Sequence, residues 1–168
     1  MHSINLNNYN YRTDLIIEKD LDNCTNNSYN DNGILIDKRE DNKKNKYVTI
    51  TFDDITDKDN YKKVEKIFIK ELKEVLGSIK DKKIMVIGLG NNKSTPDSLG
   101  PEVVDNILVT RHLFNLGEVE EGYSNVCSFK PNVTGVTGIE TSKLITSLIS
   151  FLQVDLVLII DALAASSI

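Results

Sequence analysis

Two short apolar runs constrain the fold of this chain more than any other part of its sequence. The first is IMVI, Ile84–Ile87, and the second fills most of DLVLIIDAL, Asp155–Leu163. Runs that are apolar nearly throughout are typical of strands buried on both faces, as the strands of parallel sheets are. Because helices must then cover both faces, the sequence predicts an α/β fold, with a mostly parallel sheet flanked by helices.

Helical patterns and one further strand accompany these runs. YVTITF, Tyr47–Phe52, is rich in β-branched and aromatic residues and predicts a strand. Gly77 is a natural stop for the first helix, and Pro101 suits the first residue of the second. Thr137 and Glu140 have the spacing of a capping box ahead of the third. The predicted helices cover Asp57–Gly77, Pro101–Phe114 and Glu140–Leu152. The order strand, helix, strand, helix, strand indicates one parallel sheet with right-handed crossovers.

Composition changes near Lys46. The preceding residues are rich in Asn, Asp and Lys and poor in apolar side chains, so we expect residues 21–46 to be peripheral or poorly ordered. An AT-rich genome would give the same bias without disorder, and this alternative stays open. A chain of 168 residues with 40% hydrophobic content is long enough for one globular domain.

Charge and cysteine content narrow the class of protein. A net charge of −5 and a pI near 5.1 argue against a direct nucleic-acid or membrane-surface binder, since either needs a clustered basic face. Cys24 and Cys127 form no CxxC pair and suit a reducing cytoplasm. There is no apparent signal peptide, and no apolar run approaches the roughly 20 residues that span a bilayer. We expect a cytoplasmic protein.

The turn GLGNNKSTPDSLGP, Gly88–Pro101, follows the first apolar run and allows three interpretations. A dinucleotide fingerprint requires glycine where Lys93 stands and an acidic residue about 20 positions further on, which is missing. A phosphate-binding P-loop requires a different spacing of its glycines. The remaining interpretation is a strand-to-helix turn whose glycines and proline set backbone angles.

Asp97 and Asp161 suggest a catalytic or metal-binding edge. Asp97 lies in this turn, and Asp161 follows the apolar run LVLII. The carboxyl ends of parallel strands share one edge of the sheet, where ligands and catalytic groups collect. A carboxylate there needs solvent, a partner or a metal. Two such groups suggest paired acid–base chemistry or a metal site, although Asp161 could instead cap the next turn.

Other residues are weaker candidates. His112 could reach a metal, but a lone histidine on a helix more often packs or caps. Gly135 and Gly138 are expected to shape a loop near the active edge, with substrate contact as an alternative. Glu140 is expected to complete a helix cap. Cys127 is interpreted as a small buried apolar residue rather than a nucleophile, since no histidine lies nearby in the sequence.

Three long motifs stand out: Val86–Phe114, Val133–Ile145 and Asp155–Ile168. Together they resemble the germination proteases (spore proteases) of spore-forming bacteria. YRTDLIIE, Tyr11–Glu18, is similar to the pro-sequence junction of that family, and the resemblance covers about residues 9–20 and 84–168. Asn92 stands where the family has an aromatic residue, and Ser166 where it has arginine.

The resemblance implies a substrate and a life cycle. The family is made as zymogens and degrades small acid-soluble spore proteins in the spore core during germination, cleaving after an acidic residue. For this chain it implies cleavage between Asp14 and Leu15, with residues 1–14 as pro-segment and 15–168 as the amino-terminal part of an α/β peptidase domain. Family members continue well beyond this length and form homo-oligomers. We therefore expect a fold incomplete at its C-terminal side, with an inactive truncated remnant as the alternative function.

The resemblance also implies a mechanism. The family's fold is similar to that of the hydrogenase maturation proteases, which hold a metal ion at the corresponding acidic positions. In the germination proteases the matching pair, Asp97 and Asp161 here, implies an aspartic-type dyad without a cofactor. One aspartate would be ionised and act as general base, and the other would be protonated. A metal-dependent peptidase of the maturation type is the alternative.

Overall fold

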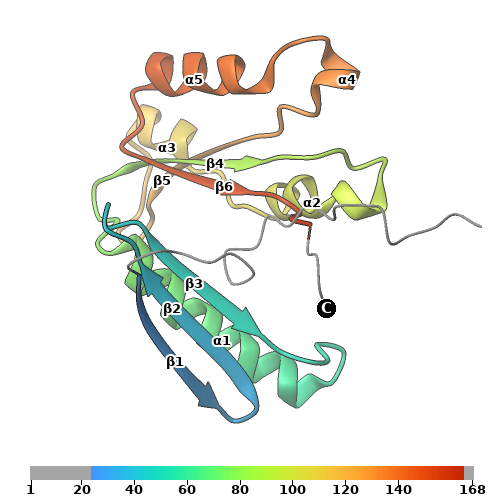
Figure 1. Ribbon diagram of the computed structural model, residues 1–168. Coiled ribbons are helices and arrows are strands. Elements are labelled where there is room, and N and C mark those ends of the chain that lie inside the picture. Colours follow the sequence, from blue (N-terminus) through green and yellow to red (C-terminus); the bar gives the residue numbers. More distant parts are fainter. Residues whose placement is uncertain (1–23, 165–168) are drawn as a thin grey trace, which may run out of the picture. The chain divides into compact units, whose positions relative to one another are not determined.

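The structure, a computed structural model, describes residues 24–164. The expected pro-segment, with Asp14 and Leu15, and Ser166 lie outside these residues. The chain divides into two units: the first contains the residues up to Ser78 together with those from Leu163 on, and the second spans Ile79–Ala162. Each contains its own three-stranded sheet, so the prediction of a single sheet is wrong (Figure 1).

The amino-terminal unit is an antiparallel sheet of order β1-β2-β3 covered by helix α1. Its elements are β1 (Thr25–Asp31), β2 (Ile34–Glu40), β3 (Lys46–Thr51) and α1 (Lys58–Leu76). Asn32 and Gly33 join β1 to β2 with φ angles of 54° and 90°, as a tight hairpin turn requires. β3 is the strand predicted at Tyr47–Phe52, but it pairs with β2 rather than with the parallel strands.

The core of this unit corrects the expectation for residues 21–46. Ile34 and Ile36 of β2 are 1% and 0% exposed and pack against Val64 and Ile67 of α1. Two isoleucines at alternate positions lie on one face of a strand, so a largely polar segment still contributes a core once a helix covers that face. Residues 25–40 therefore form ordered strands rather than a poorly ordered arm.

Helix α1 has the predicted ends to within one residue. Asp57 caps it by accepting hydrogen bonds from the backbone N–H groups of Asp59 and Asn60 at 3.1 and 2.8 Å. At the other end, Gly77 has a φ of 61° and donates its N–H to the Lys73 carbonyl at 3.0 Å. Both features are common signals of helix termini.

The second unit contains the parallel sheet, of order β5-β4-β6. The strands are β4 (Lys83–Gly88), β5 (Asn125–Phe129) and β6 (Leu156–Ile160). The helices are η3 (Thr95–Asp97), α2 (Leu99–Asp105), α3 (Arg111–Leu116), α4 (Thr134–Thr137) and α5 (Thr141–Leu152). The structure confirms β4 and β6 as parallel strands, whereas the sequence did not predict β5.

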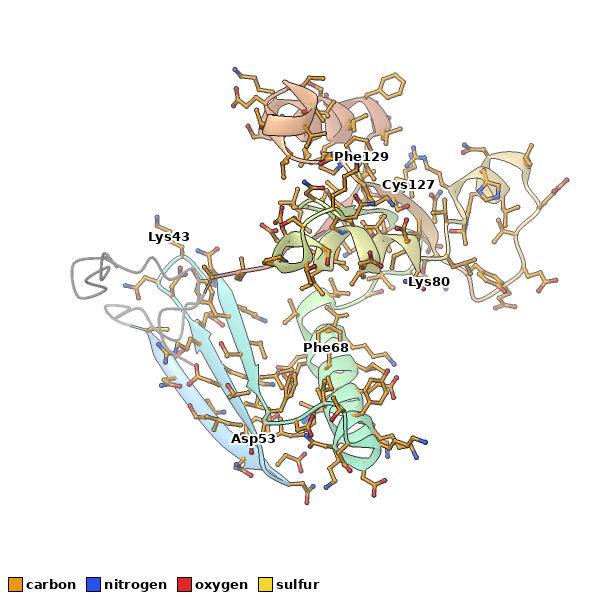
Figure 2. The ribbon with its side chains drawn as sticks, turned by 90° about the vertical axis from the view of Figure 1, so that its right-hand side faces the viewer. Lys43, Asp53, Phe68, Lys80, Cys127 and Phe129 are labelled. Carbon is orange, nitrogen blue, oxygen red and sulfur yellow. The ribbon has the colours of Figure 1, made fainter. Side chains whose placement is uncertain are left out.

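Helices cover both faces of this sheet, as predicted. Ile84 and Val86 of β4 pack with Val104 of α2 on one face. Met85 and Ile87 pack with Ile145 of α5 on the other face, together with Cys127 and Phe129 of β5. Figure 2 labels these two β5 residues on the α5 side of the sheet. No helix among residues 24–164 is long and apolar enough to cross a membrane.

The helix predicted over Pro101–Phe114 is two shorter helices. α2 begins at Leu99, two residues before Pro101, and ends at Asp105. Thr110 is 3% exposed; its hydroxyl donates to the Ser124 carbonyl and accepts from the Val126 N–H at 2.9 Å. The Thr110 N–H also donates to the Val126 carbonyl at 3.0 Å, so this backbone group bonds to β5 rather than to the preceding helical turn, and a new helix, α3, starts after it.

The predicted capping box is not formed. α5 begins at Thr141, and Glu140 makes no cap hydrogen bond through its side chain. Its carboxylate instead lies 2.6 Å from the Lys143 ammonium and accepts from the Ser142 hydroxyl at 2.9 Å. The Thr137 hydroxyl accepts from the N–H of Ile139, and the intervening residues turn before the helix starts.

Candidate active site

The turn after β4 is closed by backbone hydrogen bonds. Leu89 donates its N–H to the Ile160 carbonyl at 2.8 Å, which ties the start of the turn to the end of β6. Asn91 donates to the Asp97 carbonyl at 2.8 Å, and Asp97 donates to the Ser94 carbonyl at 2.8 Å. The turn therefore holds Asp97 through main-chain bonds on both sides of its Cα atom.

Three glycines allow this turn to pack closely. A Cβ atom on Gly88 would collide with the Gly100 carbonyl, and one on Gly90, where φ is 115°, would collide with the Asp97 carbonyl. A Cβ atom on Gly100 would collide with the Leu89 carbonyl and lie 2.5 Å from the Ile160 carbonyl. The glycines thus serve close contact between backbone segments, which agrees with the strand-to-helix interpretation of the sequence.

Asp97 and Asp161 line one cleft. Asp97 is the last residue of η3 and is half-buried, whereas Asp161 directly follows β6 and is exposed. The Asp161 carboxylate accepts a hydrogen bond from the N–H of Ala162 at 2.9 Å. The cleft has a volume of about 310 Å³. Its other lining residues are Leu89, Gly90, Asn132, Val133, Thr134 and Thr141.

Sequence reasoning missed the cleft wall that follows β5. Asn132 has a φ of 64°, and its side-chain oxygen accepts from the Val133 N–H at 2.9 Å. The hydroxyls of Thr134 and Thr141 lie 3.4 Å apart across the same wall. The signal in the sequence was a short, largely apolar stretch ending at Phe129, with Pro131 and Asn132 just after it. Because β5 was not predicted, these residues could not be assigned to the carboxyl edge of the sheet.

The remaining candidates lie outside the lining of this cleft. Gly135 belongs to α4, and Gly138 ends α4 with a φ of 70°. A Cβ atom on either glycine would meet no atom within 4 Å. Their contact with substrate stays a prediction. His112 lies in α3, and among residues 24–164 no group of three or more His, Cys, Asp or Glu side chains gathers as a metal site would.

A smaller pocket of about 150 Å³ adjoins the cleft and shares Gly90 and Asn132 with it. Its other lining residues are Asn92, Pro101 and Lys130. Lys130 follows β5, and its ammonium pairs with the carboxylate of Asp105 at the end of α2. The pocket therefore places a cation beside the cleft that contains the two aspartates.

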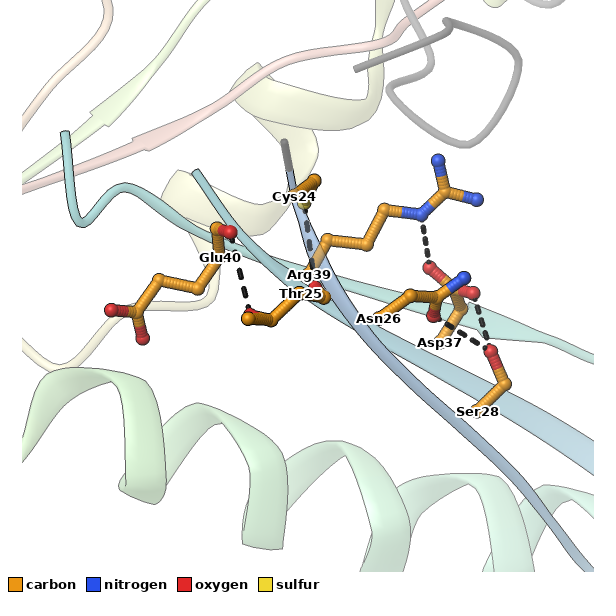
Figure 3. Close-up of polar contacts among 7 residues, drawn as sticks. All are labelled: Cys24, Thr25, Asn26, Ser28, Asp37, Arg39 and Glu40. Atoms are coloured by element: carbon orange, nitrogen blue, oxygen red, sulfur yellow. Dashed lines mark hydrogen bonds and ion pairs between the residues drawn. The ribbon is translucent and has the colours of Figure 1, made fainter. Parts of the chain in front are cut away.

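The amino-terminal unit contains a different polar cluster around Asp37, which is 5% exposed. Its carboxylate accepts from the Arg39 Nε at 2.8 Å and from the Ser28 hydroxyl at 2.7 Å. Figure 3 shows both contacts as dashed lines. Burial raises the pKa of Asp37, but the hydrogen bonds from Ser28 and Arg39 outweigh it and hold this pKa below its usual value. The carboxylate is satisfied by residues of its own sheet, which indicates a structural role.

Glu71 of α1 is held in the same way. It is 2% exposed, lies 2.6 Å from the Lys38 ammonium and accepts from the Tyr29 hydroxyl at 2.9 Å. Burial raises the pKa of Glu71, but the hydrogen bonds from Lys38 and Tyr29 outweigh this effect. The pKa of Glu71 therefore lies below its usual value. In return, the hydrogen bond to Glu71 raises the pKa of Lys38.

A family model and individual relatives point to the same protein family. A family model described as germination protease matches residues 14–168. The germination protease of Bacillus cytotoxicus is 47% identical over 129 residues, covering 73% of this chain and 35% of that protein. The germination protease of Bacillus cereus strain B4264 is 38% identical over 193 aligned positions, covering 98% of this chain and 53% of that protein. The chain thus spans between about a third and a half of the length of these relatives, and it belongs to the germination protease family.

Proposed function

We propose that this chain carries the catalytic dyad of an endopeptidase, with Asp97 and Asp161 as its two members. The observation that carries the proposal is that both carboxylates line the same cleft in a chain of the germination protease family. They follow neighbouring strands, β4 and β6, and the backbone bond from Leu89 to Ile160 holds the two chain segments together.

The chemistry requires one ionised and one protonated carboxyl group. The ionised aspartate takes a proton from a water molecule as its oxygen attacks the scissile carbonyl carbon. The protonated aspartate donates to the carbonyl oxygen as the tetrahedral intermediate forms. When this intermediate collapses, the C–N bond breaks and the amine leaves with a proton from the dyad.

The proposed substrates are the small acid-soluble spore proteins, cut after an acidic residue during germination in the spore core. The chain's own Thr13-Asp14-Leu15 sequence has the same type of site, so we propose a zymogen that is processed between Asp14 and Leu15. The full-length protein is proposed to form a homo-oligomer, to bind neither nucleic acid nor membrane directly, and to need no cofactor.

The dyad is tested by Asp97→Asn and Asp161→Asn in the full chain. Each substitution removes a proton-transfer group while nearly keeping its shape, so we expect cleavage of a small acid-soluble spore protein to fall at least about 100-fold. Asp81→Asn is the matched control, because Asp81 is exposed and has a φ of 62° that asparagine tolerates. Fragments are quantified by mass spectrometry.

Two outcomes would contradict the proposal. If either dyad variant cleaved at the rate of the parent chain, that aspartate would not be a catalytic residue. A parent chain that leaves the substrate intact would favour the alternative of an inactive remnant of the protease.

A further inference from the structure

The pocket beside the dyad cleft is placed to receive a side chain of a bound peptide. It shares Gly90 and Asn132 with the cleft that Asp97 and Asp161 line. A peptide whose scissile bond lies at the two aspartates can therefore place a neighbouring side chain between the turn after β4 and the segment after β5.

The chemistry of this pocket favours an anion. Lys130 is the charged residue among the described residues that line it, and its ammonium offers three donors. The side-chain oxygen of Asn132 already accepts from the Val133 N–H, which leaves the amide NH₂ group for a ligand. Asn92 contributes a second side-chain amide. A carboxylate matches this set of donors better than a neutral or cationic side chain does.

The charge of Lys130 would offset repulsion between the dyad and an acidic substrate side chain. An acidic side chain that enters beside Asp97 and Asp161 is repelled by the negative charge of the dyad, and a nearby ammonium offsets this repulsion. Lys130 is held in the free protein by Asp105, and the two side chains are 35% and 51% exposed. Exposed ion pairs of this kind contribute little to stability, so an incoming carboxylate can replace Asp105 as the partner of Lys130.

We propose that Lys130 is the specificity-determining residue that pairs with an acidic side chain next to the scissile bond. This inference rests on the proposed peptidase function, because the cleft must bind a peptide. It assigns the charge preference to one lysine after β5 rather than to the dyad.

Peptide binding tests the proposal without requiring turnover. The probes are the hexapeptide RTDLII, the sequence of residues 12–17, and the same peptide carrying Asp14→Asn. Both are titrated calorimetrically against the full chain carrying Asp97→Asn. We expect the acidic peptide to bind about tenfold more tightly than the neutral one. Adding Lys130→Met should reduce this ratio to about one, whereas Lys130→Arg should retain most of it.

Asp105→Asn provides a test in the opposite direction. It removes the competing carboxylate, so affinity for the acidic peptide should rise while affinity for the neutral peptide stays the same. Thermal melts of each variant check that the fold is retained. If Lys130→Arg keeps the preference for the acidic peptide and Lys130→Met loses it, the charge of Lys130 is responsible rather than the packing of its aliphatic stem.

The outcomes separate this inference from the proposed function. A charge preference that survives Lys130→Met, or equal binding of both peptides by the chain carrying Asp97→Asn alone, would overturn the assignment of Lys130. The peptidase proposal would still stand if the chain cleaved the spore protein. Conversely, a Lys130-dependent preference in a chain that does not cleave would support the pocket and contradict the peptidase activity.

Discussion

At the scale of single residues, Gly90 determines where Asp97 lies. A side chain at Gly90 would meet the Asp97 carbonyl and would also be strained at a φ of 115°. We expect Gly90→Ala to destabilise the chain by about 1–3 kcal/mol and to lower cleavage by displacing Asp97. Gly135→Ala is the control for stability, since its Cβ atom would meet nothing within 4 Å. Urea denaturation compares the two, and equal stability would refute the close-packing argument.

The donor set of the dyad gives a second prediction at this scale. Asp97 and Asp161 are the acidic side chains of the cleft, and no His or Cys is among the described residues that line it. Two carboxylates alone make an incomplete site for zinc or nickel. We expect cleavage to be unaffected by EDTA or 1,10-phenanthroline. Activity that is lost on chelation and regained with added zinc or nickel would support a metal-dependent peptidase like the hydrogenase maturation proteases instead.

At the scale of elements, Thr110 joins α3 to β5. Its buried hydroxyl bonds the Ser124 carbonyl and the Val126 N–H, so Thr110→Val leaves two backbone groups unsatisfied. We expect a loss of about 1–3 kcal/mol in the free energy of unfolding. Thr146→Val is the matched control: Thr146 is exposed on α5, its hydroxyl donates only to the Ser142 carbonyl, and it should change stability by less than about 0.5 kcal/mol. Equal losses would refute the bridge.

Elements also show what the sequence could predict. β4 and β6 were predicted because each is a continuous apolar run with polar ends. β5 was missed because Ser128 interrupts a short stretch of apolar residues. β3 was assigned to the wrong sheet because alternation along a strand does not identify its partner. The bridge from Thr110 to β5 ends a helical pattern through a tertiary contact that no local periodicity contains.

Which residues of the candidate site were predicted depended on which strands were predicted. Asp97 and Asp161 were predicted as site residues because they follow the two strands that the sequence indicated. Lys130 and Asn132 were not, since they follow the strand that was missed. The sequence therefore predicted residues that line the cleft only after the parallel strands that it also predicted.

At the scale of the whole molecule, acid should unfold the amino-terminal unit first. The pKa values of Asp37 and Glu71 lie below their ordinary values of 3.8 and 4.5 in the folded state. A depressed folded pKa gives stability that is complete above the ordinary pKa and is lost as pH falls through the folded value. We expect constant stability from pH 7 to about 5 and a decline below pH 4.

Hydrogen exchange locates this transition. Because the two units have separate cores, amides of β2 should lose protection at a higher pH than amides of β4. Glu71→Gln should make the free energy of unfolding depend less steeply on pH in acid, because it removes one of the groups that take up a proton on unfolding. Simultaneous loss of protection in both strands, or stability that rises on acidification, would contradict this assignment.

The backbone origin of the cleft has a consequence for how this family can diverge. Main-chain bonds from Leu89 and Asn91 fix the two aspartates, and side chains of the surrounding wall take no part in those bonds. We therefore expect substitutions at Asn92, Lys130 or Thr134 to leave the positions of the two aspartates unchanged. On the proposed function, the main chain would fix the two aspartates and the rim side chains would set the peptide preference, so that preference could change by single substitutions along the rim.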